Sequence, residues 1–400
     1  MAEKQRPSLI VIAYACSPVR GSEYGAGWGV VMALNEIADL TVLTGDRHIN
    51  ELRDWERENP DSAIEFVEVP DPRIGRLMRW HRVPEFILYL LWQRRAKRAG
   101  KYIVATGQFD AAAHATFAAC WLPTAATSLG VPSVWGPVGG GVTTPRALWT
   151  LMGPVGVFQE LLDLISVRLM ASLPATRRNA MRATERVLQN EESRSLLPAA
   201  ARAGSRILNH ALFSVVPNPP PEGDGRYALW VSPMESRKGP RLVIEALAKT
   251  SSGVALKMVG DGPQRKSLEE LAHRLGVSDR VTFTGWIDRK EAVKLMRGAT
   301  TVVFTGLREE GGLALAEALY TARRVIVLDH GGAGSIARSA TDQERVILVR
   351  PGDLDAVASG FAAAIDTHYE ASPVDDRPLL DREAAVAELK EAVFTALDHR

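Results

Sequence analysis

Short apolar runs alternate along the chain with longer stretches in which apolar residues recur every three or four positions. The first run, residues 8–15, is continuous and rich in β-branched side chains, which is typical of a strand buried in a parallel sheet. A glycine-rich loop at residues 20–27 follows, and the spacing of Val31, Leu34 and Ile37 predicts a helix that begins near Trp28. Strand, loop and helix in this order predict a βαβ unit.

The same alternation runs through the rest of the chain and is interrupted once. The segment 215–221 is rich in proline and can continue neither a helix nor a central strand, so it is the best candidate for a linker. Strands are predicted at 40–43, 64–69, 112–116 and 133–135 before it, and at 228–231, 255–259, 281–283, 301–304 and 325–328 after it; helices are predicted at 240–248, 264–275, 289–297 and 313–320.

This order predicts the α/β class, with two Rossmann-like, doubly wound domains that face each other across a cleft. Ligands of open parallel sheets bind at the carboxyl ends of the strands, so the cleft is the expected site. We expect the N-terminal domain at 1–217 and the C-terminal domain at 218–380. A helix at 381–400 is expected to pack back toward the N-terminal domain.

Composition narrows the classes of protein. The 400 residues are 46% hydrophobic and 24% charged, as in a soluble globular protein, and 48 basic against 47 acidic residues speak against a nucleic-acid partner. Cys16 and Cys120 have no metal-type spacing and cannot cross-link a chain of this length, which indicates a reducing, cytoplasmic location. The polar start of the chain lacks the apolar region of a signal peptide.

One segment, residues 73–101, departs from this even charge. It holds nine basic residues and one acidic residue, Glu85, around an apolar run at 86–92 that is too short to span a bilayer. Arginine, tryptophan and apolar side chains together suit peripheral contact with an anionic membrane, at its inner face in a cytoplasmic protein. The alternative is a buried helix whose flanking arginines are solvated.

The segment 308–319 carries the clearest chemical signal. Gly311 and Gly312 follow a predicted strand and open a predicted helix, an arrangement whose exposed N–H groups suit a diphosphate. Glu309 precedes this helix and Glu317 lies about two turns along it. Glutamates around a helix start also serve simply as caps, so spacing alone leaves both interpretations open.

Neighbouring segments extend the signal. The blocks LWVSPMESRKG at 229–239, KMVGDGP at 257–263 and DRVTFTGW at 279–286, followed by the two glutamates eight residues apart, resemble the nucleotide-binding domain of family-4 retaining glycosyltransferases, which have the GT-B fold. The resemblance covers residues 227–353 most strongly, and it implies that the domain at 218–380 binds the nucleotide sugar while the domain at 1–217 lies on the acceptor side. The resemblance extends to the N-terminal half through CSPVRGSEYGAGW at 16–28 and WGPVGGG at 135–141.

The resemblance implies a role for each matching residue. Lys238 and Arg237 would neutralise the donor diphosphate, and the backbone of Gly311, Gly312 and Leu313 would cap it. Glu317 would bind the ribose hydroxyls. Glu309 and His114 would contact the transferred sugar or the acceptor as catalytic residues. Trp286 and Ile287 would border the base. Gly21, in the N-terminal glycine-rich loop, would help to bind the donor.

The implied activity is transfer of a sugar from a nucleotide-diphosphate sugar to a carbohydrate, lipid-linked or small-molecule acceptor, with retention, without metal and with no cofactor besides this co-substrate. Two departures from the family pattern are Ser232-Pro233, where the family commonly has Gly-Arg, and Ala322 with Arg324 in place of Gly and Pro. The alternatives are an inactive nucleotide-sugar-binding protein that acts as a partner or scaffold, a phosphorylase or synthase, and an epimerase of the same fold.

Overall fold

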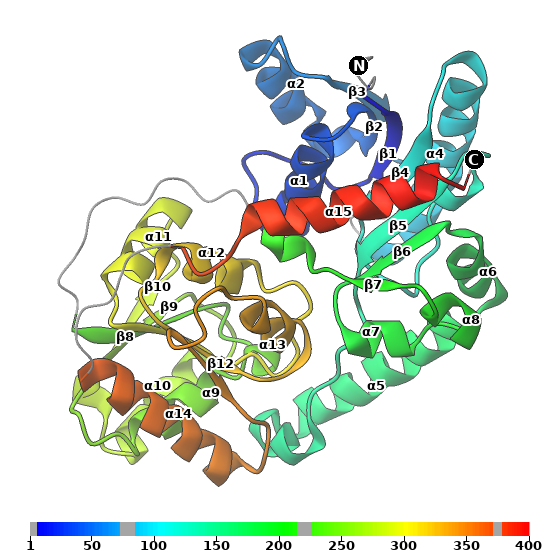
Figure 1. Ribbon diagram of the computed structural model, residues 1–400. Helices are drawn as coiled ribbons and strands as arrows, with labels where there is room; N and C mark the ends of the chain where they lie inside the picture. Colours follow the sequence, from blue (N-terminus) through cyan, green and yellow to red (C-terminus); the bar gives the residue numbers. More distant parts are fainter. Residues whose placement is uncertain (1–5, 73–84, 214–225, 371–377, 400) are drawn as a thin grey trace. The chain divides into compact units, whose positions relative to one another are not determined.

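Two separate parallel sheets organise the chain in the computed structural model, which describes residues 6–72, 85–213, 226–370 and 378–399 (Figure 1). One compact unit comprises Met1–Gly141, Ser166–Ser214 and Arg382–Arg400. The other comprises Val142–Ile165 and Val215–Asp381. Each sheet lies wholly in one unit, as the α/β prediction requires.

The first unit contains a seven-stranded sheet in the order β3-β2-β1-β4-β5-β6-β7, with every neighbouring pair parallel. Its strands are β1 (Ser8–Ala13), β2 (Asp39–Gly45), β3 (Ile64–Val69), β4 (Ala111–Thr116), β5 (Ser133–Val138), β6 (Glu185–Leu188) and β7 (Arg206–Ile207). Its helices are α1 (Ser22–Asn35), α2 (Ile49–Glu58), α4 (Glu85–Thr106), α6 (Pro174–Arg182), α7 (Glu191–Ser195), α8 (Ala199–Arg202) and α15 (Arg382–Leu397), while α5 (Gly153–Ser172) crosses the boundary between the units.

The helix after the first strand begins at Ser22, not near Trp28 as the sequence pattern predicts. The predicted glycine-rich loop is therefore largely the first two turns of α1. Gly27 explains how the helix approaches the sheet, since a Cβ atom there would lie 2.2 Å from the carbonyl oxygen of Ala15. Clustered glycines predict a loop, but Gly27 instead permits close packing of a helix against the residues that follow β1.

The second unit contains a six-stranded parallel sheet in the order β10-β9-β8-β11-β12-β13. Its strands are β8 (Tyr227–Val231), β9 (Ala255–Val259), β10 (Val281–Gly285), β11 (Thr301–Phe304), β12 (Val325–Leu328) and β13 (Val346–Val349). Its helices are α9 (Pro240–Leu247), α10 (Arg265–Arg274), α11 (Arg289–Gly298), α12 (Leu313–Thr321), α13 (Gly331–Arg338) and α14 (Leu354–Glu370).

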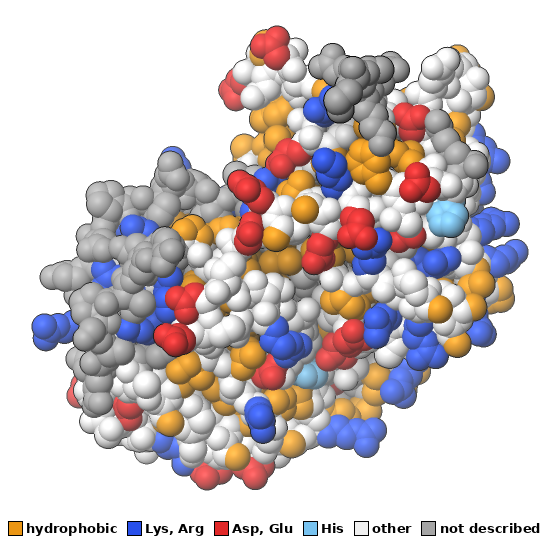
Figure 2. Space-filling view, viewed as in Figure 1, with side chains coloured by type: hydrophobic (Ala, Val, Ile, Leu, Met, Phe, Trp, Pro, Cys, Tyr) orange, Lys and Arg blue, Asp and Glu red, His pale blue; other side chains and the backbone are white. Residues whose placement is uncertain are grey.

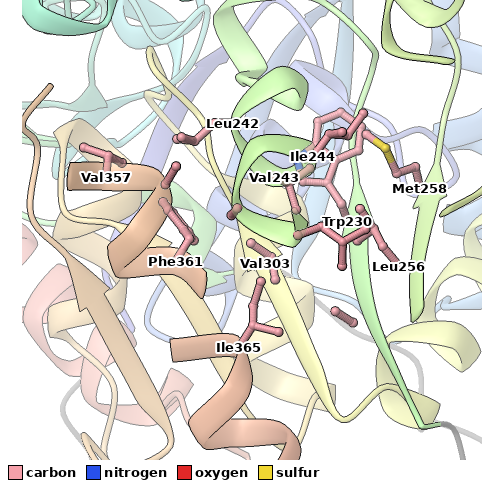
Figure 3. Close-up of a cluster of buried hydrophobic side chains, with 14 of the residues drawn as sticks. Trp230, Leu242, Val243, Ile244, Leu256, Met258, Val303, Val357, Phe361 and Ile365 are labelled. Atoms are coloured by element: carbon pink, nitrogen blue, oxygen red, sulfur yellow. The ribbon is translucent and has the colours of Figure 1, made fainter. Parts of the chain in front are cut away.

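An extended apolar cluster packs against this second sheet. Figure 3 shows side chains of α9 and α14 meeting those of β8, β9 and β11, with Trp230, Phe361 and Ile365 all at most 1% exposed. The buried indole of Trp230 donates a hydrogen bond from Nε1 to Oγ1 of Thr305, 2.9 Å away. The core is thereby connected directly to the segment that follows β11.

The domain boundary differs from the predicted one. Residues 142–165 belong to the second unit, because Leu148, Leu151 and Met152 are buried in the same apolar cluster as Trp230. A linker prediction from proline content could not detect this, since the segment lies far from residue 217. The predicted hinge at 215–221 falls outside the residues that the structure describes.

The C-terminal helix α15 is part of the first unit (Figure 1). Its apolar face, which includes Leu389 and Val393, is buried, and Arg382 pairs with Glu36 at 2.6 Å.

Helix α4 holds the apolar run of the predicted membrane segment. Leu88, Tyr89 and Trp92 are buried, and the Trp92 indole donates a hydrogen bond to the Val69 carbonyl oxygen at 2.8 Å. This run therefore belongs to the core of the first unit. The arginine-rich residues 73–82 lie outside the described part of the chain.

Candidate functional site

The strand order of the second sheet reverses between β8 and β11. The chain proceeds from β8 outward to β9 and β10 on one side, and from β11 outward to β12 and β13 on the other. Loops that leave two such neighbouring strands diverge and form a crevice at the carboxyl edge, where open α/β sheets bind ligands. The loop after β8 carries Arg237 and Lys238, and the loop after β11 carries Glu309, Gly311 and Gly312.

The structure brings Lys238 and Glu309 together as an ion pair between Nζ and Oε2. Backbone contacts hold the two loops in register: Leu307 N donates to the Arg237 carbonyl oxygen at 2.9 Å. Oγ1 of Thr305, which accepts from the core tryptophan, donates to the Lys238 carbonyl oxygen at 3.0 Å. Gly239, at φ +61°, turns the chain into α9 immediately after the lysine. Lys238 thus has a position set by the buried core.

Glu309 is negatively charged in this setting. Burial of the carboxyl group raises its pKa, but the ion pair with Lys238, the charge of Arg237 and a hydrogen bond from Gly312 N at 3.2 Å outweigh burial. The net pKa of Glu309 therefore lies below its ordinary value. Arg237 itself pairs with Glu235 at 2.8 Å. A carboxylate and an ammonium, mostly shielded from solvent, consequently lie side by side at the switch point.

Gly312 forms the N-cap of α12 in the left-handed conformation, at φ +49°. A Cβ atom at this position would lie 3.1 Å from Cδ1 of Ile336, so both the backbone conformation and the space favour glycine. Leu313 is the first residue of the helix and is partly exposed. The N–H groups of this first turn, with the adjacent lysine, make a site suited to an anion.

Glu317 lies on α12, and its side chain is 16% exposed. Its Oε1 accepts a hydrogen bond from Nε of Arg289 in α11 at 2.6 Å. Trp286 and Ile287 stand between β10 and α11, with the indole 68% exposed and the isoleucine partly buried. An exposed indole at the carboxyl edge offers a flat surface on which a base can stack.

Residues 142–144 also belong to this region, although the sequence pattern does not predict it. Val142 N donates to Oε1 of Glu310 at 2.6 Å, and Nε2 of His330 lies 2.6 Å from the Thr143 carbonyl oxygen. Arg308 pairs with Asp163 at 2.7 Å and with Glu160 at 3.1 Å. The run of three glycines before Val142 was the available signal, but glycine content does not reveal which unit a segment joins.

His114 and Gly21 lie in the first unit. Gly21 is the exposed N-cap of α1. His114, in β4, is 1% exposed, and its Nε2 lies 3.3 Å from the Phe117 carbonyl oxygen. Burial lowers the pKa of His114 to about 4, against the opposing effect of the Phe117 contact, so its imidazole is neutral near pH 7. Contact of either residue with a sugar stays a prediction.

Metal ligands do not gather at this edge. Across residues 6–72, 85–213, 226–370 and 378–399, no three His, Cys, Asp or Glu side chains are arranged to hold a metal ion. Within the same ranges, no helix is long and apolar enough to cross a bilayer. The positive charge that is present near Glu309 comes from Lys238, Arg237 and the start of α12.

Comparison with known proteins matches most of the second unit to a family model. Residues 217–372 match the family model of glycosyl transferases group 1. The lipopolysaccharide core biosynthesis glycosyltransferase LpsE of Rhizobium meliloti is 35% identical over 130 residues, which are 32% of this chain and 35% of that protein. The 2-deoxystreptamine glucosyltransferase of Streptomyces kanamyceticus is 26% identical over 149 residues, 36% of this chain and 38% of that protein. The matches thus span little more than a third of each relative.

A solved structure extends the likeness to the whole chain. HepE from Anabaena, in complex with UDP, has a TM-score of 0.54 at 14% identity and covers 97% of this chain and 100% of its own. At this identity the likeness is one of fold. Together with the two parallel sheets, it confirms the prediction of the GT-B fold with two Rossmann-like domains.

Proposed function

We propose that this protein is a retaining glycosyltransferase that moves a sugar from a nucleotide-diphosphate sugar to the hydroxyl group of an acceptor. The observation that carries the proposal is the Lys238–Glu309 pair beside the N-terminus of α12, at the switch point of the second sheet. The match of residues 217–372 to the glycosyl transferases group 1 model includes all of these residues.

In this proposal the leaving diphosphate binds at Lys238 and the first turn of α12. An ammonium group has three N–H donors, so Lys238 can bind a phosphate oxygen while it holds Glu309. Negative charge grows on the diphosphate as the bond to the sugar breaks, and fixed donors at this point stabilise the transition state more than the ground state. Arg237 adds charge nearby, and the reaction as proposed requires neither metal nor cofactor.

Glu309 would lie beside the sugar. Its lowered pKa keeps it ionised at neutral pH, and a carboxylate there favours the positive charge that develops on the anomeric carbon. We assign no carboxylate, Glu309 included, the role of covalent nucleophile. In this proposal the acceptor hydroxyl attacks on the face that the diphosphate leaves, the departing phosphate accepts the proton of that hydroxyl, and the configuration of the anomeric carbon is retained.

Glu317 and Trp286 would bind the nucleoside. The carboxylate of Glu317 accepts hydrogen bonds from the ribose hydroxyls, and Arg289 holds it in position. Trp286 and Ile287 border the base. UDP is the first nucleotide to test, because the structure of HepE was solved with it. We propose a carbohydrate, a lipid-linked sugar or a small molecule as the acceptor, in keeping with the names of the relatives.

The test is release of nucleoside diphosphate from UDP-, GDP-, ADP- and TDP-glucose by the purified protein and three variants. Glu317→Gln should raise the donor KM, by a factor that corresponds to a loss of about 1.5–3 kcal/mol in binding free energy, because a hydrogen bond to a charged group is weakened. Glu309→Gln should lower kcat with little change in KM, and Lys238→Ala should lower both kcat and kcat/KM. Glu269→Gln, which removes a comparable glutamate–arginine pair on α10, is the control.

The outcomes separate the alternatives. Donor binding by calorimetry without turnover of any donor would indicate an inactive nucleotide-sugar-binding protein. Turnover only with inorganic phosphate would indicate a phosphorylase. The anomeric configuration of the first sugar product, read by NMR, decides between retention and inversion.

A further inference from the structure

Helix α5 (Gly153–Ser172) has an apolar face that is exposed in the part of the chain that the structure describes. Gly156 and Glu160 are buried on one side of the helix. On the opposite side, exposed apolar residues recur at alternating intervals of three and four: Val155 (71% exposed), Phe158 (61%), Leu162 (48%), Ile165 (62%) and Leu169 (62%). This spacing places the five side chains in one stripe, called here the α5 stripe.

The outward face of a helix in a globular protein is normally polar, so the α5 stripe requires an explanation. The exposed apolar residues of α5 are neighbours on one surface and not single, scattered residues. Leu161, which is also exposed, lies directly beside the stripe and widens it. Of the eleven exposed large hydrophobic residues in the described part of the chain, six lie on this one helix. Contiguous exposed apolar surface of this kind marks a site of contact with another molecule or a membrane.

The charges around the α5 stripe are predominantly positive. Residues 143–183 contain five arginines and two acidic residues, and both acids, Glu160 and Asp163, pair with Arg308. Arg168 lies on α5 itself, and exposed arginines continue directly into α6 at 177, 178 and 182. Orange and blue side chains lie close together over α6 and the adjoining end of α5 in Figure 2.

These charges discriminate between two occupants. A second copy of the chain, paired through the α5 stripe, would bring Arg168 against the same arginine in a parallel arrangement. In an antiparallel arrangement Arg168 would lie near the start of the other copy's α5, where residues 153–159 include no acidic residue. Neither arrangement supplies opposite charge. An anionic surface does.

We infer that the α5 stripe and its flanking arginines dock this protein on the surface of a membrane rich in anionic lipids. The apolar side chains enter the boundary between headgroups and acyl chains, and the arginines contact lipid phosphates. A helix of this length is about 30 Å long and lies in the plane of the membrane. This inference does not depend on the glycosyltransferase proposal, and it assigns the contact to α5 and α6 rather than to residues 73–101.

The experiment is flotation of the full chain with vesicles of phosphatidylcholine alone and of phosphatidylcholine with phosphatidylglycerol. The wild-type protein should bind only the anionic vesicles, and less at high salt because surface charges are screened. Arg168→Ser/Arg177→Ser/Arg182→Ser should weaken partitioning by about 100-fold, at roughly fivefold for each arginine near the surface. Phe158→Gln/Ile165→Gln should weaken it by at least about tenfold.

Matched controls lie on the first unit. Val19→Gln/Tyr102→Gln removes two apolar residues that are 76% and 72% exposed, and Arg94→Ser/Arg98→Ser/Lys101→Ser removes three exposed charges of α4. Both controls should bind as the wild type does. All altered side chains are exposed, so melting temperatures should remain close to the wild-type value.

Three outcomes would overturn the inference: no flotation at any lipid charge, loss of binding in the α4 variant but not in the α5 variants, or a dimer in solution that the Phe158→Gln/Ile165→Gln variant converts to monomer without any vesicle binding.

Discussion

At the scale of single residues, the candidate site combines charge with burial. Lys238 and Glu309 have side chains only 15% and 19% exposed, so each would be costly to desolvate without the other. The hydrogen-bonded series from Trp230 through Thr305 to the Lys238 backbone connects this pair to the apolar core. The geometry of the pair therefore depends on the packing of the second sheet, and not only on its two loops.

His114 provides a residue-scale prediction for the first unit. Its pKa of about 4 lies below the ordinary value near 6.5 because the ring is buried. Between these values the unfolded chain binds more protons than the folded chain, so stability rises with pH and is lost as pH falls. His114→Gln should remove about 3 kcal/mol of this dependence between pH 4 and 6.5, measured by urea unfolding.

The variant with exposed His273 replaced by Gln controls for loss of a histidine as such. An unchanged slope of unfolding free energy against pH in His114→Gln would show that His114 has the same pKa in the folded and unfolded chain, contrary to the burial argument.

At the scale of elements, α12 and its glycine cap carry the anion site. Gly312→Ala places a side chain at φ +49° and 3.1 Å from Ile336, so we expect a loss of about 1–3 kcal/mol in stability. Gly253→Ala is a matched control, since Gly253 has φ +66° but no heavy atom within 4 Å of the added Cβ. Thermal unfolding should show the larger loss at Gly312, and the donor KM should rise only there.

If both variants lost stability equally, the backbone conformation alone would account for the effect. The contact with Ile336 would then have no part in holding the start of α12.

At the scale of the whole molecule, the two units have separate apolar cores. Trp230 and Phe361 belong to the core of the second unit, and Tyr89 and Trp92 to that of the first. We therefore expect UDP to stabilise the second unit directly. At a concentration 100 times Kd it should add about 2.7 kcal/mol, seen as slower amide exchange in β8 and β11.

Exchange in β1 and β4 should change much less, and Glu317→Gln at the same UDP concentration should reduce the protection. Protection confined to β1 and β4 would place the nucleotide in the first unit and contradict the proposed site.

Much of this architecture follows from the sequence alone. The short, largely apolar runs of the second unit predict β9, β11 and β12 to the residue, with Lys257 as the one charged residue among them, because strands of a sheet covered by helices are rich in apolar and β-branched residues. The glycines before α12 and the glutamates eight residues apart predict where charged groups meet, because both signals lie within one short segment. These features depend on local spacing, and local spacing is what a sequence displays.

Only the tertiary structure decided which distant segments pack together. It placed 142–165 in the second unit, started α1 at Ser22, paired Glu317 with Arg289, and covered α4 while leaving the apolar face of α5 exposed. Helices α4 and α5 are both rich in apolar residues, and nothing in their periodicity tells them apart. Burial depends on whether another element covers a face, and that is a property of contacts between residues far apart in the chain.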